Sequence, residues 1–382
     1  FEDKDEIKKR GAKWIPGLRK WMVPRDLDFD DFWQWWPKDL KQYIFNDRFI
    51  CQGYRTTGGQ SEVFQGWDME ETEFCAIKLF SKEHGSNIGK EAFEREHNAL
   101  TVLAGHEGIL KELDYGKHEL SDRFFSVTPW VKYTVTDLIK DPSGTVVSLF
   151  EDLVEILNRE LDNNVTIAEF FEGLCEDVGI KSESFDSKEE LVKACLEKDA
   201  EDPWLDTWFD LEKILDGLVY AFNKGIMHRD LKPDNIFLGW PDSEELGLIF
   251  KIADFGASKN FKIKKKHTVV GFHSEPWNPN PHHPNEVNYQ DTWDVFSVGV
   301  IAISLISETY LETYEDIKKV LDKKVQPMIG EKLHTYLSKA VSLDPVVRPA
   351  NVKVMRTELR KLSKERKEVL KKVKKKRKKN SK

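Results

Sequence analysis

The division of the chain into a β-patterned stretch and a later helical stretch restricts its fold more than any other feature. Three segments rich in β-branched and aromatic residues predict strands: Arg48–Tyr54, Glu62–Trp67 and Glu73–Phe80. One helix is expected at Gly89–Ala104, and the pattern is mainly helical from about residue 205 onward. Trp293–Ile306 is apolar nearly all round, which predicts a helix buried in a core. A small β-rich lobe followed by a larger helical lobe, an α+β fold, is therefore expected.

The first expected helix carries a carboxylate on its apolar side. Phe93, Glu96, Leu100 and Leu103 recur at spacings of three and four residues, so Glu96 lies on the apolar stripe of this helix. Burying an unpaired carboxylate is costly. An ion pair with Lys78, at the end of the expected strand, removes that cost. The alternative is that Glu96 lies at the edge of the stripe and reaches water.

Two short segments in the helical half contain several charged and polar residues close together. His228–Asn235 reads HRDLKPDN, and Ala253–Gly256 reads ADFG after a hydrophobic hairpin. These residues resemble the catalytic loop and the metal-binding segment of protein kinases, and a match over eight consecutive residues is highly specific. Within this match, Lys232 points to kinases of the eukaryotic-like Ser/Thr type. The resemblance implies a bilobal fold and ATP-dependent transfer of the γ-phosphate to Ser/Thr hydroxyls of proteins, with autophosphorylation that would make the chain a phosphoprotein.

The resemblance also implies a role for each polar side chain. Phosphoryl transfer depends mainly on positioning and on neutralising charge. Asp230 would accept the proton of the substrate hydroxyl, and Lys232 would neutralise charge on the moving phosphoryl group. Asn235 and Asp254 would supply hard oxygen ligands to Mg²⁺. The alternative is a turn with solvated charges.

The remaining nucleotide contacts are expected before residue 132. The loop Thr56–Val63 resembles the glycine-rich loop of the bacterial type, although Thr56 and Ser61 stand where the first and third glycines would be. Gly58 and Gly59 still permit close approach of the backbone to phosphate. The resemblance implies that Lys78, paired with Glu96, binds the α- and β-phosphates. Val63 and Ala76 would lie on either side of the adenine, and Thr128 would be the gatekeeper. The Pro129 C=O and the Val131 N–H would bind the adenine edge.

One stretch departs from the family pattern. No clear APE motif follows Gly271, where residues 272–279 read FHSEPWNP. This stretch shapes the substrate-binding floor in the family, so the peptide specificity is left open.

Two other function classes are alternatives to an active kinase. A pseudokinase scaffold would normally have lost Lys78, Asp230 or Asp254, and a small-molecule phosphotransferase would lack the Arg229/Lys232 pattern.

Charge is distributed unevenly along the chain, whose net charge is -8. Residues 141–203 carry a net charge of -13 and residues 353–382 carry +13. We divide the chain into an aromatic-rich N-terminal extension (1–43), a kinase N-lobe and hinge (44–131), a C-lobe (132–366) with an acidic helical insertion at about 141–203, and a polybasic tail (367–382). The tail is expected to dock on an acidic surface that includes the insertion, within one chain or between two, or else to bind nucleic acid or an anionic surface.

The sequence shows no sign of a membrane-spanning helix. No apolar run approaches the ~20 residues that a transmembrane helix needs, so no transmembrane segment is expected. The four cysteines are scattered without a CxxC pair, which is typical of free thiols in a reducing compartment and favours a cytoplasmic location. Thr268 lies where kinases are controlled by phosphorylation, and cations such as Lys262 and Arg229 could order a phosphate there. An exposed loop threonine is the alternative.

Overall fold

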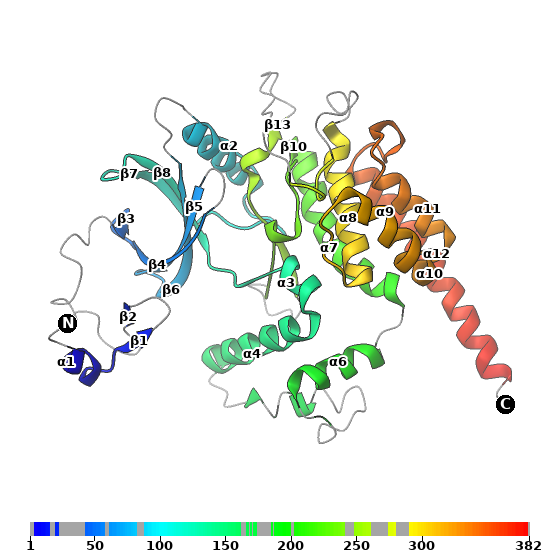
Figure 1. The fold of residues 1–382 in the computed structure, drawn as a ribbon, viewed down its shortest axis with the longest axis horizontal. Helices are drawn as coiled ribbons and strands as arrows, with labels where there is room; N and C mark the ends of the chain where they lie inside the picture. Colours follow the sequence, from blue (N-terminus) through cyan, green and yellow to red (C-terminus); the bar gives the residue numbers. More distant parts are fainter. Residues whose placement is uncertain are drawn as a thin grey trace. The chain divides into compact units, whose positions relative to one another are not determined.

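The computed structural model describes residues 4–15, 20–22, 43–57, 61–81, 88–161, 166–167, 169, 171–173, 185, 187–199, 202–240, 248–260, 274–279 and 290–380. The chain forms two compact units. The first comprises residues 1–97 and 111–130, and the second comprises residues 98–110 and 131–382. The first is built on a β-sheet and the second mainly on helices (Figure 1), so the expected α+β organisation is confirmed.

The first unit contains a six-stranded antiparallel sheet in the order β3-β4-β5-β6-β8-β7. Its strands are β3 (Ile44–Phe45), β4 (Phe49–Thr57), β5 (Ser61–Asp68), β6 (Glu73–Phe80), β7 (Asp114–His118) and β8 (Arg123–Pro129). β4, β5 and β6 are the three strands that the sequence predicts, with bounds within a few residues. A short helix α1 (Lys4–Lys9) and the pair β1 (Lys13–Ile15) and β2 (Lys20–Met22) precede them. Most of the tryptophan-rich extension lies outside the described residues.

One face of this sheet packs on a hydrophobic core, and the other carries the residues predicted to bind the nucleotide. Cys75, Ile77, Phe125 and Val127 are fully buried in a core that Phe45 and Phe49 complete. Residues directly opposite each other on paired strands lie on one face. Val63 is opposite Lys78, and Ala76 is opposite Thr128. These four side chains therefore share the other face, which is the face that the expected nucleotide contacts require.

The helix α2 (Ile88–Leu103) begins and ends within one residue of the predicted helix. Phe93 packs on Phe80 and Phe124, with ring centroids 5.5 and 4.9 Å apart. These contacts place the N-terminal part of α2 on the Lys78 face of the sheet. The last turn of α2 belongs to the second unit, where Ala99, Leu100 and Leu103 join the core.

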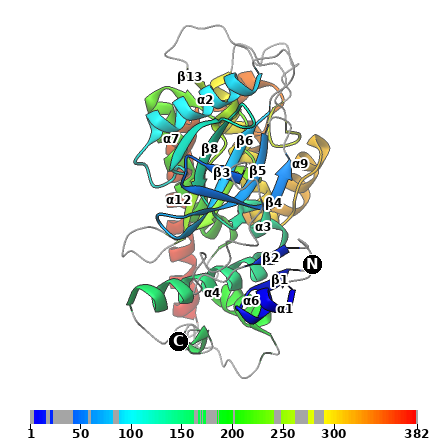
Figure 2. The same cartoon turned by 90° about the vertical axis from the view of Figure 1, so that its left-hand side faces the viewer.

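The second unit is built around two long helices, α7 (Pro203–Lys224) and α8 (Trp293–Ser307), which pack together (Figure 1). Figure 2 shows α7 on the same side as α12, against which it also packs. Asp202 caps the N-terminus of α7, and Gly225 ends it in the left-handed conformation at φ 95°. Its other helices are α3 (Val135–Lys140), α4 (Pro142–Leu161), α6 (Lys188–Asp199), α9 (Tyr314–Val320), α10 (Gln326–Ile329), α11 (Glu331–Ala340) and α12 (Val352–Asn380), and its strands are β9 (Tyr133–Thr134), β10 (Ile226–Met227), β11 (Ile236–Gly239), β12 (Ile249–Ile252) and β13 (Lys259–Asn260). α8 is buried almost throughout, as predicted.

The acidic insertion contains α4 and α6, which pack together around Val147, Leu191 and Val192. The sequence predicts helices at Leu149–Leu161 and Lys188–Lys198, so α4 begins seven residues earlier than expected. The reason is local. Asp141 accepts a hydrogen bond from the Gly144 N–H at 3.0 Å, and Pro142 stands in the first turn, where its missing N–H costs nothing.

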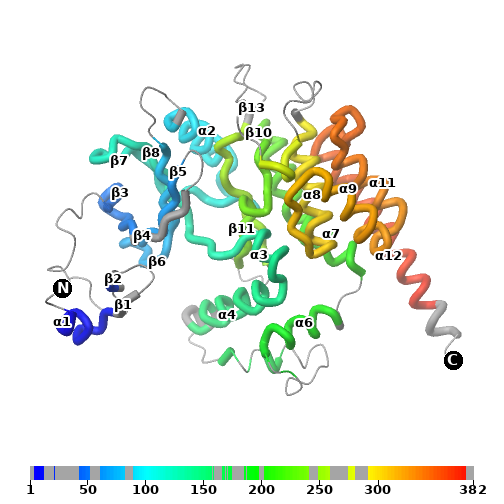
Figure 3. Tube along the Cα trace, viewed as in Figure 1, coloured from blue at the N-terminus to red at the C-terminus, as the bar shows by residue number. Residues whose placement is uncertain are grey.

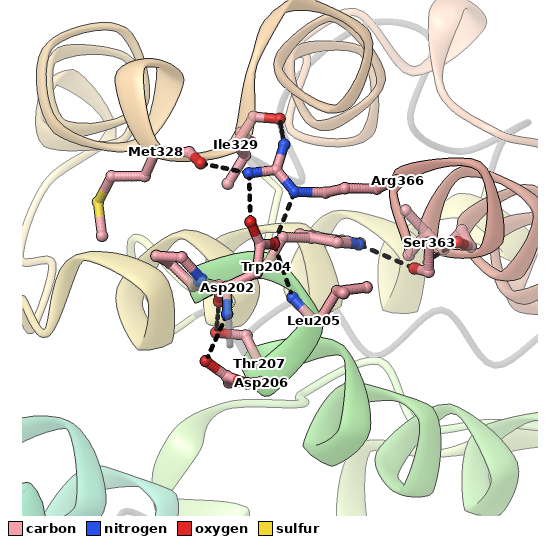
Figure 4. A network of polar contacts seen from close by, with 11 residues as sticks. Asp202, Trp204, Leu205, Asp206, Thr207, Met328, Ile329, Ser363 and Arg366 are labelled. Atoms are coloured by element: carbon pink, nitrogen blue, oxygen red, sulfur yellow. Dashed lines mark hydrogen bonds and ion pairs between the residues drawn. The ribbon is translucent and has the colours of Figure 1, made fainter. Parts of the chain in front are cut away.

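Polar contacts attach α12 to the start of α7 (Figure 4). Arg366 binds both carboxylate oxygens of Asp202, at 2.6 and 2.7 Å, and also donates to the carbonyls of Met328 and Ile329. The Trp204 indole donates to Ser363 Oγ at 2.8 Å. These contacts explain why the buried Asp202 carboxylate is tolerated at the beginning of α7.

The C-terminal part of α12 extends beyond the helices it packs against (Figure 3). Leu359 is fully buried, whereas Val369 and Val373 are 58% and 41% exposed. The apolar side chains of α12 are therefore buried only in its first part. Among the described helices, none is both long enough and apolar enough to cross a membrane.

Candidate functional site

The side chains of Lys78 and Glu96 form an ion pair in the first unit. Lys78 Nζ lies 2.7 Å from Glu96 Oε2, and the two side chains are 16% and 5% exposed. The predicted pair is therefore present, and it explains how a carboxylate can lie on the buried stripe of α2. Because the strand β6 holds the lysine stem, the ammonium group has a fixed position on the Val63–Ala76 face of the sheet.

Two further contacts brace this part of the first unit. His97, next to Glu96 on α2, lies with Nδ1 2.7 Å from Glu112 Oε2, and burial raises the pKa of Glu112. Arg123 binds Glu62 at 2.5 Å and donates to the carbonyls of Leu79 and Phe80. The first contact fixes the rotation of α2, and the second ties the start of β5 to the end of β6.

The predicted catalytic loop in the second unit is held by its backbone. The N–H groups of His228 and Arg229 donate to the two carboxylate oxygens of Asp294, at 2.9 and 2.8 Å. Asp294 lies in the first turn of the buried helix α8 and is 6% exposed. Arg229 has a positive φ of 70°, which costs energy and persists only where neighbours impose it. Asp294 is such a neighbour.

His228 connects this loop to the Ala253–Gly256 segment. Its Nε2 lies 2.8 Å from the Ala253 carbonyl, and its Nδ1 accepts from the Asp230 N–H at 3.3 Å. A carbonyl only accepts, so Nε2 carries a proton and donates to it. The imidazole therefore fixes the backbone of Asp230 relative to the segment that contains Asp254.

Asp230 is partly enclosed by polar side chains. Its carboxylate is 13% exposed, and Lys232 Nζ lies 4.0 Å from Oδ2. Asn278 Nδ2 donates to Oδ1 at 2.6 Å. Lys232 also lies 3.4 Å from Ser274 Oγ. The carboxylate thus has one oxygen in a short hydrogen bond and the other beside a cation.

Asn235 and Asp254 provide oxygen donors of the type that Mg²⁺ prefers. The Asn235 amide nitrogen donates to the Asp230 carbonyl at 2.9 Å, so its oxygen is turned away from that contact. The Ala253 N–H donates to the Asn235 carbonyl at 2.9 Å, which brings the two segments together. Asp254 adopts a left-handed conformation at φ 59°. One carboxylate and one amide oxygen suit an ion that keeps water and phosphate as its other ligands.

The other predicted site residues are placed as follows. Val63, Ala76 and Thr128 share the sheet face of Lys78, Pro129 ends β8, and Val131 begins the second segment of the second unit. Gly58, Gly59 and Thr268 lie outside the described residues.

Sequence reasoning missed three residues that contact or support the loop: Asp294, Asn278 and Ser297. Asp294 begins a segment that was read only as a buried helix, and a charged residue inside such an apolar run is a usable signal of a buried role. Asn278 lies in the stretch that departs from the family pattern. Nothing local distinguishes it from a loop asparagine, so only the three-dimensional structure reveals its contact.

Glu96→Ala is expected to lower the free energy of unfolding by about 1.5–3 kcal/mol, because it removes a charged hydrogen bond that is mostly buried. Urea unfolding measures this loss. Glu94→Ala is the matched control, since Glu94 on the same helix pairs with Lys90 at 52% exposure, and exposed pairs contribute roughly 0.5 kcal/mol or less. Equal losses in the two variants would contradict the expectation.

Several known proteins resemble parts of this chain. A sequence model of the protein kinase domain matches residues 162–380. This range includes the catalytic loop and Asp254, whereas Lys78 and Glu96 precede it. Aurora kinase A-A of Xenopus laevis is 29% identical over 142 residues, which are 35% of this chain and 32% of that protein. The serine/threonine-protein kinase pakH of Dictyostelium discoideum is 38% identical over 96 residues, which are 25% of this chain and 17% of that protein.

These alignments span less than half of each relative. Among solved structures, the kinase domain of Mycobacterium tuberculosis PknI, as a double mutant, aligns with a TM-score of 0.48 and 14% sequence identity. That alignment covers 84% of this chain and 98% of that chain.

Proposed function

This chain belongs to the protein kinase domain family, and we propose that it is an active Ser/Thr protein kinase. In this proposal it transfers the γ-phosphate of ATP to Ser/Thr hydroxyls of proteins. The observation that carries the proposal is the environment of Asp230, a mostly buried carboxylate with one oxygen bound by Asn278 and the other beside Lys232. A carboxylate held in this way can accept a proton from a hydroxyl, and the cation beside it can neutralise charge on a phosphoryl group.

The cofactors in this proposal are ATP and Mg²⁺. Asn235 and Asp254 would hold the metal ion, which would neutralise the charge that develops on the phosphates. Lys78, held by Glu96, would bind the α- and β-phosphates. Gly58 and Gly59 would approach the phosphates, while Val63, Ala76, Thr128, Pro129 and Val131 would bind the adenine.

Two alternatives are distinguishable from this function. A pseudokinase scaffold would bind nucleotide without turnover, but Lys78, Asp230 and Asp254 are all retained. A small-molecule phosphotransferase would phosphorylate a sugar or an aminoglycoside. Lys232 lies beside Asp230, and two relatives that align with part of the chain are named serine/threonine-protein kinases, so both observations support transfer to Ser/Thr residues of proteins.

The proposal is tested by supplying the purified chain with labelled ATP, Mg²⁺ and separate acceptors: casein, myelin basic protein, kanamycin and glucose. We expect label on a protein, and phosphoamino acid analysis should find phosphoserine or phosphothreonine. Transfer to kanamycin or glucose alone would show that the chain is a small-molecule phosphotransferase and would overturn the proposal. Peptide mapping of the chain in the same experiment tests autophosphorylation, with Thr268→Ala as the variant that should remove the expected site.

The basic tail is proposed to bind an anionic partner. The proposed partner is the acidic insertion, in the same chain or in a second copy, and nucleic acid or an anionic surface is the alternative. A labelled peptide of residues 367–382, which follow the packed part of α12, should bind the chain that lacks them at low salt and lose affinity when the acids of the insertion are neutralised. Affinity unchanged by neutralisation would leave nucleic acid or an anionic surface as the partner.

A further inference from the structure

We propose that Asn278 is a positioning residue for Asp230, which rests on the proposed function of Asp230 as the base. Asn278 comes from the stretch that lacks the family's usual motif. Its side-chain amide donates to Asp230 Oδ1 at 2.6 Å, which is a short, charge-assisted hydrogen bond. The structure therefore supplies a direct contact to the reacting carboxylate from a segment in which the sequence pattern predicts none.

Three further hydrogen bonds fix Asn278 in one orientation. Its Oδ1 accepts from Ser297 Oγ at 3.0 Å, and its carbonyl accepts from the Tyr314 hydroxyl at 2.7 Å. Its N–H donates to the Ser274 carbonyl at 3.0 Å. The residue is fully buried. An ionised carboxylate only accepts hydrogen bonds, so the amide nitrogen must face Asp230 and the amide oxygen must face Ser297.

This contact decides which oxygen of Asp230 is available. Oδ1 is occupied by Asn278, whereas Oδ2 lies 4.0 Å from Lys232 Nζ. A hydroxyl that approaches Oδ2 therefore meets the base beside the cation that would neutralise the moving phosphoryl group. Without Asn278 the carboxylate could rotate, and proton transfer depends steeply on such geometry.

The helix α8 provides a common support for the loop and for Asn278. Asp294 and Ser297 are three residues apart, so they lie on the same side of this helix. Asp294 holds the backbone of His228 and Arg229, and Ser297 holds the side chain of Asn278. The backbone and the side chain of the base are thereby both fixed to one buried element, which is the arrangement a positioning role requires.

The test is a double-mutant cycle of Asn278→Ala and Asp230→Asn, with transfer measured in single turnovers. Asn278→Ala alone should lower the rate roughly 10- to 100-fold, the range for a slightly misplaced catalytic group, with little change in the KM for ATP. In the Asp230→Asn background it should cost less than about threefold, because the group that it positions no longer acts. Asn278→Asp keeps the size of the side chain but puts a second carboxylate beside Asp230, so it should be at least as slow as Asn278→Ala.

Each outcome separates the two proposals. The same loss from Asn278→Ala in both backgrounds, or wild-type activity of Asn278→Asp, would show that Asn278 only fills space and would overturn this inference. Wild-type activity of Asp230→Asn would instead overturn the proposed function. If Asn278→Ala does not fold, Ser297→Ala retains Asn278 but releases its orientation. It should lower the rate about fivefold, the effect of one ordinary hydrogen bond, and this loss should vanish in the Asp230→Asn background.

Discussion

Asp230→Asn is expected to bind ATP as the unmodified chain does and to transfer phosphate roughly 10²–10⁴ times more slowly, the range for a lost general base. The amide has nearly the shape of the carboxylate, so the packing around the loop is retained. It cannot accept the proton of a hydroxyl. The measurement is the single-turnover rate with saturating MgATP, together with the affinity for a fluorescent nucleotide.

Asp234→Asn is the matched control for this variant. Asp234 is in the same loop, carries the same charge and receives the same substitution, but its side chain is exposed. Its rate should remain within a few fold of that of the unmodified chain, since isolated surface charges contribute little. If the two variants lose activity equally, the effect is due to loop charge in general, and Asp230 is not the base.

Asp254→Asn is expected to abolish most Mg²⁺-dependent activity. A metal ion that neutralises charge in the transition state contributes several kcal/mol, and a loss of about 4 kcal/mol corresponds to roughly 10³-fold in rate. Asparagine retains an oxygen that can accept from the Gly256 N–H, the contact that Asp254 makes at 3.4 Å. The substitution should therefore leave the local turn intact while it removes the charge.

The Mg²⁺ dependence of ATP binding identifies the cause of this loss. The unmodified chain should bind ATP more tightly as Mg²⁺ is added, and Asp254→Asn should lose most of this gain while its affinity without Mg²⁺ stays the same. An unchanged Mg²⁺ dependence would show that Asp254 does not hold the metal ion.

The sequence predicts the fold well where burial leaves a periodic pattern. β5, β6, α2 and α8 begin and end close to the predicted bounds, because alternating or all-apolar patterns extend along their whole length. The start of α4 was missed because its first turn contains Pro142, Ser143 and Gly144, which show no apolar helical pattern. The hydrogen bond from the Gly144 N–H to Asp141 and the burial of Val147 stabilise that first part of the helix.

The candidate site is predictable only in part for a similar reason. The Lys78–Glu96 pair follows from the cost of burying a carboxylate, and the structure confirms it at 2.7 Å. Contacts such as Asn278–Asp230 join residues 48 positions apart in the chain. No local pattern encodes them, because the partner is chosen by how α8 and the loops pack. The catalytic roles themselves stay predictions until rates are measured.

We propose an active kinase rather than a nucleotide-binding scaffold, and the two differ in whether bound MgATP is turned over. The affinity for MgATP and the appearance of phosphoserine or phosphothreonine in single turnovers, measured on the same purified sample, distinguish them. We expect saturable binding accompanied by transfer that Asp230→Asn nearly removes. Saturable binding of MgATP without transfer to casein, myelin basic protein or the chain itself would contradict the claim and identify the chain as a scaffold.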